Sequence, residues 1–335
     1  MSNVTIKDIA AALSLSVSTV SRALSGDRNV SVKTREAVLS AAGEMGYRKN
    51  PVAASLKAGK TQTVGVVAPE MWSGYTIQVI RGIQSVLYPL GIRVIIADSG
   101  EDPLREEENI LMMERFMVDG LIVGLCSYLK NKELYTRLLS QKTPLVFYGR
   151  IPHGLDVSQV LVDDYAKSFF MVERMILSGR RRIVHIEGPE SIYNSVERAR
   201  GYRDAMAKYD LPRDPSLRIR TGIGIEDGVR AVDRLLEEKV PFDAIFSFTE
   251  RPAVGALNRL REHGLRIPED IAVCSFSGTT YTEAVYPHMT TVAPPMFAMG
   301  ETAAELIMEK VKDPSSAPRT VILNAEIKMH GSTGY

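Results

Sequence analysis

A chain of 335 residues is long enough for two or three domains with ample core. Its hydrophobic fraction of 45% and charged fraction of 24% are ordinary for a soluble globular protein, and it has no low-complexity segment. No apolar run approaches the roughly 18 residues of a membrane span, and no basic-then-apolar leader opens the chain. The only cysteines, Cys126 and Cys274, lie in apolar, strand-like runs. We therefore expect a cytoplasmic protein with two buried thiols.

The formal net charge of +1 is unevenly distributed along the chain. Residues 1–60 contain nine Lys and Arg against four Asp and Glu, a net charge of +5, so the remainder carries −4. A basic head on a mildly acidic body places a polyanionic partner at the N-terminus.

The first two dozen residues predict two short helices joined by a tight turn. Thr5, with Asp8 three residues on, and Ser16 are suitable N-caps. Apolar residues recur at helical spacing, namely Ile6, Ile9, Ala10 and Leu13 in the first helix and Val20, Ala23 and Leu24 in the second. By spacing alone, two helices of an ordinary bundle would be the commoner explanation.

The outward face of the second helix decides between these alternatives. It carries Val17, Ser18, Ser21 and Arg22, and no acidic residue occurs between Ser14 and Gly26. Hydroxyls and arginine suit phosphates and guanine edges, whereas a solvated face normally mixes both signs of charge. The pattern predicts a helix-turn-helix whose second helix enters the major groove of double-stranded DNA.

A third helix is predicted to follow a loop at residues 26–30, with Ser31 as its cap. Its expected buried side consists of Val32, Ala37, Val38, Ala41 and Met45. Ser31 and Thr34 lie at its start, where backbone N–H groups and hydroxyls suit a phosphate.

Residues 50–60 predict a further short helix. Asn50 is a good N-cap, Pro51 suits the first helical position and Gly59 suits the end. Roughly eight residues fall below the ~12–15 that an isolated helix needs, so a plain linker is the alternative.

The N-terminal residues resemble the opening signature of the lactose-repressor/galactose-repressor family of bacterial transcription regulators. The resemblance is most specific over residues 4–56, in the segments 4–10, 17–22, 30–35 and 46–47, and it extends more loosely over the whole chain. The chain departs from the family at Leu13-Ser14, usually Ala-Gly, and at Lys49, usually Pro.

The resemblance implies that residues 50–60 are a hinge helix, formed only on DNA, whose Leu56 wedges into the minor groove. The DNA-contacting set that it implies is Thr5, Ser16, Val17, Ser18, Thr19, Ser21, Arg22, Ser31, Thr34, Tyr47, Asn50, Ala53 and Leu56.

From Thr61 onward, near-continuous apolar strands alternate with amphipathic helices, which predicts parallel sheets covered on both faces. The expected strands are 64–68, 93–97, 121–124, 145–148, 183–186, 244–248 and 271–275. The expected helices are 77–87, 104–117, 166–177, 197–208, 226–238 and 254–262.

The resemblance supplies the layout of this part. After an all-α helix-turn-helix head (1–49) and hinge (50–60), it implies a two-lobed α/β sensing domain like a periplasmic sugar-binding protein. We expect the N-terminal lobe to span 61–160 and 290–319, and the C-terminal lobe to span 161–289 and 320–335. The chain ends at Tyr335 without the leucine-heptad tail that makes some relatives tetramers, so we expect a homodimer.

Enzyme chemistry finds no support in the residues. The five histidines are scattered without metal-ligand spacing, and paired-cysteine motifs, a phosphate-loop lysine and the Gly-x-Ser-x-Gly motif are absent. The acidic run Glu106–Glu108 near a helix start is expected to be a solvated face. We expect no cofactor and no metal.

A ligand of such a fold binds beyond the carboxyl ends of the strands, between the lobes. The resemblance implies an effector set of Trp72, Tyr75, Arg150, Tyr193, Arg198, Glu250 and Ser277. Trp72, the only tryptophan, could instead be simple lobe packing.

Several family pocket residues are replaced in this chain. Gly149, Glu250 and Ser277 stand where an Asp is usual, Pro294 stands for Gln, and Ile223 stands for an aromatic residue. Because acceptors are lost while Arg150 and Arg198 remain, we expect an anionic effector such as a sugar acid or sugar phosphate, with a neutral oligosaccharide as the alternative.

The sequence thus predicts a homodimeric repressor of carbohydrate-metabolism genes that binds a near-palindromic operator and responds to a small sugar or sugar derivative. A solute-binding protein for transport and an enzyme on the same scaffold are the rival interpretations.

Overall fold

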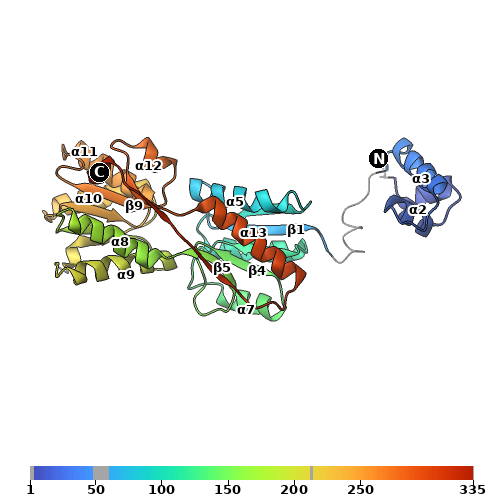
Figure 1. Cartoon of the computed structure of the whole chain (residues 1–335), viewed down its shortest axis with the longest axis horizontal. Coiled ribbons are helices and arrows are strands. Elements are labelled where there is room, and N and C mark those ends of the chain that lie inside the picture. Colours follow the sequence, from blue (N-terminus) through green and yellow to red (C-terminus); the bar gives the residue numbers. More distant parts are fainter. Residues whose placement is uncertain (1–3, 48–59, 212–213, 335) are drawn as a thin grey trace. The chain divides into compact units, whose positions relative to one another are not determined.

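The computed structural model describes residues 4–47, 60–211 and 214–334. The chain forms two compact units, Met1–Thr61 and Gln62–Tyr335, and the second unit contains two α/β lobes (Figure 1). The predicted hinge contacts Asn50, Ala53 and Leu56 lie outside the described residues.

Residues 4–47 of the N-terminal unit form three helices, α1 (Ile6–Ala12), α2 (Val17–Leu24) and α3 (Val32–Glu44). Their starts follow the predicted caps. The Thr5 backbone N–H donates to the Asp8 carboxylate at 2.7 Å, and the Ser16 and Ser31 hydroxyls accept from the N–H groups of residues 19 and 34. Such caps satisfy backbone donors that a helix start leaves without partners. The core of this unit consists of Ile9, Ala10, Val20, Ala23, Val30, Val38 and Ala42.

The predicted buried side of the third helix was partly wrong. Val32 is 68% exposed and Ala37 is also exposed. Val38 and Ala42 set the buried face, and one turn before Val38 the half-buried Arg35 donates to the Asp27 carbonyl at 2.7 Å. Val38 of the predicted set lies in the core and Ala41 and Met45 pack against it, so the prediction was wrong only for Val32 and Ala37.

The first lobe is built on a six-stranded sheet with the order β11-β5-β4-β3-β1-β2. Its strands are β1 (Thr63–Ala68), β2 (Arg93–Asp98), β3 (Gly120–Val123), β4 (Leu145–Tyr148), β5 (Ser158–Val162) and β11 (Thr320–Leu323), all paired in parallel. Helices α5 (Gly74–Leu87) and α13 (Met296–Lys312) contribute to the core on one face, and α6 (Pro103–Arg115) and α7 (Lys132–Ser140) to that on the other.

The second lobe repeats this plan with the order β12-β10-β9-β8-β6-β7. Its strands are β6 (Ile183–Glu187), β7 (Arg218–Arg220), β8 (Ala244–Ser247), β9 (Ala272–Phe276), β10 (Thr290–Ala293) and the antiparallel β12 (Glu326–Lys328). Its helices are α8 (Asp164–Leu177) and α9 (Tyr193–Lys208) on one face, α10 (Ile225–Glu237) and α11 (Glu250–Glu262) on the other, and the short α12 (Thr280–Ala284).

The chain passes between the lobes three times, as Figure 1 shows, after β5, after β10 and after β11. The predicted boundaries between the lobes at residues 290 and 320 each assign a strand to the wrong lobe. Residues 290–293 pair with β9 in the second lobe, and residues 320–323 pair with β5 in the first. The predicted limit at residue 160 likewise divides β5 (Ser158–Val162), so sheet pairing moves all three crossings a few residues toward the C-terminus.

All seven predicted strands are present within one or two residues. The strands that were not predicted include the edge strands β7, β11 and β12, whose residues are mostly exposed or half-buried. A strand at a sheet edge lacks the continuous apolar run that marks a central parallel strand.

Helices α5 and α13 touch backbone to backbone through two glycines. A Cβ atom on Gly82 would lie 2.0 Å from the Phe297 carbonyl oxygen, and one on Gly300 would lie 2.0 Å from the Val79 carbonyl oxygen. Gly228 and Gly255 make the equivalent contact between α10 and α11. Only glycine fits at these four positions, because any side chain would occupy the space of the neighbouring backbone.

Within the described residues, no helix is long and apolar enough to cross a membrane, and no cluster of potential metal ligands occurs. Cys126 and Cys274 are buried free thiols, as predicted.

Candidate functional site

The recognition helix α2 presents the outward face that its sequence predicts. Val17 is 45% exposed although it is apolar, and Ser18 and Arg22 are exposed beside it. Val20 and Ala23 are buried in the core of this unit. The exposed residues thus form a surface of one apolar, one hydroxyl and one cationic side chain, which suits base edges in a major groove.

Most of the remaining predicted DNA contacts on this unit lie at helix starts, whereas Ser21 lies within α2 and Tyr47 follows α3. The hydroxyls of Ser16 and Thr19 lie 2.8 Å apart at the start of α2, and those of Ser31 and Thr34 lie 2.8 Å apart at the start of α3. Thr5 is exposed, Ser21 is half-buried, and the half-buried Tyr47 packs against the core. Two helix starts with paired hydroxyls are suitable for phosphate oxygens.

A cavity in the second unit is lined by side chains from both lobes. It contains about 760 Å³ of empty space, including the part that is open to solvent. The predicted effector residues that line it are Trp72, Tyr75, Arg150, Arg198, Glu250 and Ser277. The lining follows the carboxyl ends of β1, β4, β8 and β9, where a ligand of an open α/β sheet is expected.

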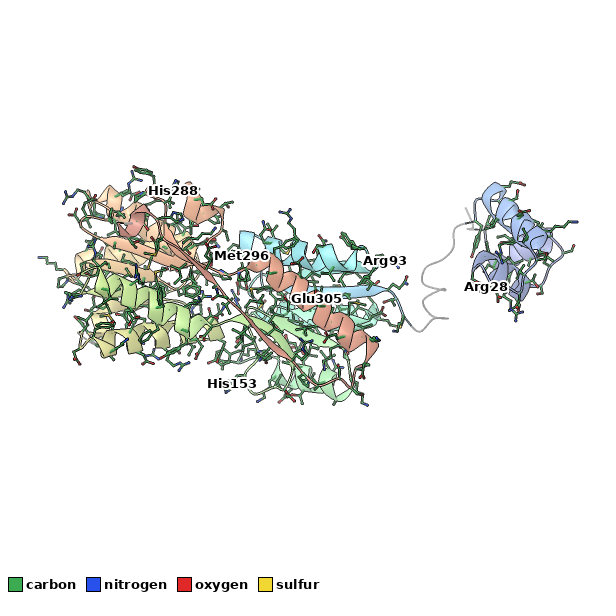
Figure 2. The ribbon with its side chains drawn as sticks, in the orientation of Figure 1. Arg28, Arg93, His153, His288, Met296 and Glu305 are labelled. Carbon is green, nitrogen blue, oxygen red and sulfur yellow. The ribbon has the colours of Figure 1, made fainter. Side chains whose placement is uncertain are left out.

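Tyr193 is not part of this lining. Its ring packs edge-on against Tyr128 and is stacked 6.4 Å from His153, both from the first lobe. Figure 2 labels His153 on the side of the first lobe nearest the second. The backbone N–H of Tyr128 also donates to the Ser191 carbonyl at 3.0 Å, so this group bridges the lobes outside the cavity.

Both arginines that suggested an anionic ligand are neutralised within the protein. The Arg150 guanidinium donates to both carboxylate oxygens of Glu101, at 2.6 and 2.8 Å. Arg198 lies 2.7–2.8 Å from the Asp164 carboxylate, donates to the Phe248 carbonyl, and stacks 3.8 Å from the Phe276 ring centroid. These contacts remove the charge argument for an anionic effector that the two arginines had provided.

Burial opposes ionisation of two carboxyl groups at the cavity. It raises the pKa of Asp164, although the neighbouring Arg198 acts against this shift. Burial likewise raises the pKa of Glu250, which accepts hydrogen bonds from the backbone N–H and the hydroxyl of Thr279. The third carboxylate, Glu70, accepts from the hydroxyls of Ser73 and Thr76 at 2.5 Å each. All three side chains are thus bound to groups of their own lobe.

Gly149 takes the place of the Asp that the family resemblance implied, and the hydroxyl of Tyr75 lies where a side chain at this position would begin. A Cβ atom on Gly149 would lie 2.5 Å from the Tyr75 hydroxyl oxygen, and the residue has φ +65°. The Tyr75 ring therefore fills the space of the missing acceptor.

Trp72 belongs to the first lobe and meets Arg251 of the second. The Arg251 guanidinium carbon lies 3.9 Å from the Trp72 ring centroid, a cation–π contact, and the tryptophan is 45% exposed. Trp72 therefore lines the cavity and contacts the opposite lobe.

Three lining residues that the sequence analysis missed carry buried polar atoms without hydrogen-bond partners among the described residues. They are Tyr148 Oη, Asn194 Oδ1 and Arg251 Nε. Tyr148 ends strand β4 and Arg251 follows β8 by four residues, so their place at strand ends was the signal that could have identified them.

Comparison with known proteins identifies both units. Residues 5–50 match the model for bacterial regulatory proteins of the lacI family, and residues 172–333 match the model for a periplasmic binding protein-like domain.

Relatives match along nearly the whole chain. Catabolite control protein A of Priestia megaterium is 30% identical over 332 residues, which cover 99% of each chain. A solved complex of the transcriptional regulator CelR with cellobiose is 29% identical, with a TM-score of 0.74, over 98% of this chain and 100% of that chain. The lac repressor dimer, solved with operator and an anti-inducer, shares the fold, with a TM-score of 0.86 and 21% identity over 99% of each chain.

Proposed function

Because the chain belongs to the lacI family of bacterial regulatory proteins and is a DNA-binding transcription repressor, we propose that a small sugar or sugar derivative, bound between its lobes, switches its operator affinity. The genes that it controls are those of carbohydrate metabolism. The observation that carries this proposal is one cavity, lined by both lobes, in a chain whose N-terminal unit exposes a recognition helix.

Ligand control follows from where the cavity lies. Trp72 and Tyr75 come from the first lobe and Arg198 and Ser277 from the second, so one ligand contacts both lobes at once. A ligand that binds one lobe arrangement more tightly shifts the population toward it. The lobe arrangement in turn changes the affinity of the N-terminal unit for the operator, which couples the two binding sites.

The repressor acts as a homodimer on a near-palindromic operator, because each head reads one half-site. The first lobe offers a surface for a second copy at β2, the edge strand of its sheet. Large apolar side chains on or after the neighbouring helices α5 and α6 are more than two-fifths exposed: Ile77, Tyr88, Leu90, Phe116 and Met117. An edge strand with exposed apolar neighbours is a typical protein contact surface. A repressor of this kind works in the cytoplasm, where its operator DNA lies.

A solute-binding protein for transport is disfavoured by the basic helix-turn-helix unit. An enzyme is disfavoured because several relatives that match nearly the whole chain are named as transcriptional regulators or repressors. Incubating the protein with candidate sugars and assaying for turnover would distinguish the enzyme alternative.

The test combines a thermal-shift screen with operator binding. A ligand at a hundred times its dissociation constant stabilises the folded state by ~2.7 kcal/mol, which raises the melting temperature by several degrees. Each sugar, sugar acid and sugar phosphate that shifts the melting temperature is then added to a gel-shift titration on operator DNA. We expect at least one of them to change operator affinity and to leave random DNA unaffected. Ligands that bind without any change in operator affinity would refute the proposed control.

A further inference from the structure

Besides the three crossing segments, side chains join the two lobes at two separate places. At the first, the Arg251 guanidinium carbon of the second lobe lies 3.9 Å from the Trp72 ring centroid of the first. At the second, the Tyr193 ring of the second lobe packs against Tyr128 and His153 of the first, with centroid distances of 5.9 and 6.4 Å. We call the first contact the tryptophan clasp and the second the tyrosine clasp.

Each clasp is supported by hydrogen bonds of the backbone beside it. The loop that carries Trp72 is fixed by Glu70, whose carboxylate accepts from the backbone N–H and the hydroxyl of Ser73 at 2.8 and 2.5 Å. In the tyrosine clasp, the backbone N–H of Tyr128 donates to the Ser191 carbonyl of the other lobe at 3.0 Å. The first bonds order the tryptophan loop in advance, so that closing it costs little conformational entropy, and the second is a direct link between the lobes.

Both clasps consist of contacts between protein groups. Tyr128, His153 and Tyr193 lie outside the lining of the ligand cavity, so the tyrosine clasp can be altered without changing a lining residue. Aromatic pairs and cation–π contacts stabilise an interface beyond the area that they bury. Because both clasps connect the same two lobes, both favour the same closed arrangement.

We propose that the two clasps jointly set the balance between open and closed lobes in the free protein, so that breaking one of them loosens the other. A ligand then acts on an equilibrium that the chain itself has already shifted toward closure. This inference concerns the arrangement of the lobes and goes beyond the proposed function. Its test does not depend on which ligand binds or on whether a ligand controls operator affinity.

The experiment breaks the tyrosine clasp and measures the tryptophan clasp. Trp72 is the only tryptophan and is 45% exposed beside Arg251, so quenching of its fluorescence by acrylamide reports how far the second lobe covers it. In Tyr193→Leu we expect the quenching constant to rise about twofold, because the population shifts toward open lobes in which the ring is uncovered. Tyr128→Leu removes the same ring contact from the first lobe and should give the same increase. The double variant should show no larger increase than either single variant, because both substitutions break one contact.

Two controls distinguish the clasp from a general loss of stability. Tyr193→Phe keeps the ring, so its quenching should equal that of the wild type. Tyr165→Leu removes another half-buried ring of the second lobe, which packs 6.3 Å from Phe169 and 3.9 Å from the Arg200 guanidinium carbon within that lobe. This variant should lower the melting temperature without changing the quenching of Trp72.

Two results would overturn the inference. The first is unchanged quenching in Tyr193→Leu and Tyr128→Leu while circular dichroism shows both proteins folded. The second is an equal increase in Tyr165→Leu, because the effect would then come from loosening of the second lobe itself. His153→Ala removes a ring of the clasp at an exposed position, where folding tolerates the change, and should raise the quenching constant in the same direction. Unchanged quenching in this folded variant counts equally against the inference.

Discussion

The buried pair between Arg198 and Asp164 allows a test of how the ligand cavity is held together. Arg198→Met removes the cation but keeps an apolar side chain of similar length over the Phe276 ring. Both members of the pair are buried, with side-chain exposures of 9% and 8%. We expect the variant to lose its response to effector and also to lose stability in the second lobe.

The magnitude follows from what the substitution leaves behind. Asp164 keeps its buried carboxylate without a cation, and the Phe248 carbonyl loses a donor. Breaking a buried ion pair by removing one partner costs ~3–5 kcal/mol. Asp164→Asn in the same background removes the uncompensated charge, so the double variant regains ~1–3 kcal/mol relative to the sum of the single variants.

The pH dependence of the cost has a definite sign. Burial already raises the pKa of Asp164, and Arg198 opposes that shift. Without Arg198 the folded-state pKa rises further above the unfolded value, so the folded state binds a proton more readily. The cost of Arg198→Met is therefore largest at pH 7 and shrinks as the pH falls toward about 4, the unfolded value of an aspartate.

The assay is urea unfolding of the wild type, both single variants and the double variant at pH 7 and pH 5, together with an operator titration. Operator affinity without ligand should be retained, because the pair lies in the second unit. Strict additivity of the two substitutions, or a cost of Arg198→Met below ~1 kcal/mol, would refute this account of the pair.

Three further predictions concern other parts of the chain. Arg22→Ala should cost ~1–3 kcal/mol on operator in a gel-shift titration and little on random DNA; equal losses would make Arg22 a phosphate contact only. Leu56→Ala, at a position outside the described residues, should weaken operator binding ten- to a hundredfold at fixed salt and reduce DNA bending. Equal operator affinity of the variant and the wild type would mean that residues 50–60 are a passive linker. His185 is fully buried between the rings of Tyr202 and Phe246, and burial lowers its pKa to about 4. The unfolded state therefore binds more protons than the folded state below about pH 6.5. Between pH 7 and pH 4 the unfolding free energy of the wild type should fall by ~3 kcal/mol more than that of His185→Phe. Parallel pH profiles of the two proteins in urea unfolding would contradict this.

The N-terminal unit was predictable because its determinants are local. Ser16 and Ser31 mark the helix starts through contacts three residues away, and Val20 and Ala23 mark the buried face. The first turns of α3 were harder to predict, because Val32 is exposed while Arg35 is half-buried against a loop carbonyl eight residues earlier. Local signals determine where a helix begins, whereas packing determines which side turns inward.

In the cavity, too, local sequence signals locate the residues, whereas the fold determines their contacts. The residues near the carboxyl ends of strands could be located from the alternation of strands and helices, and six of the seven predicted effector residues line one cavity. The ion pairs of Arg150 and Arg198 could not be predicted in this way, because their partners Glu101 and Asp164 lie 49 and 34 residues away in the sequence. Only the fold brings such distant residues together. An arginine that looks free to bind a ligand in the sequence can therefore already be paired with a carboxylate in the structure.

The glycine contacts between neighbouring helices determine how the second unit can deform. Because α5 and α13 meet at the backbone through Gly82 and Gly300, no layer of side chains remains between them that could slide or repack. Gly228 and Gly255 join α10 and α11 in the same way in the other lobe. Each lobe therefore resists internal deformation, so we expect a rotation of one lobe against the other to bend the three crossing segments rather than the lobes. The cavity lies near the crossing segments, whereas β1 begins at the opposite end of the first lobe. A small rotation about those segments would therefore displace the start of β1, which follows residue 60, by a larger distance.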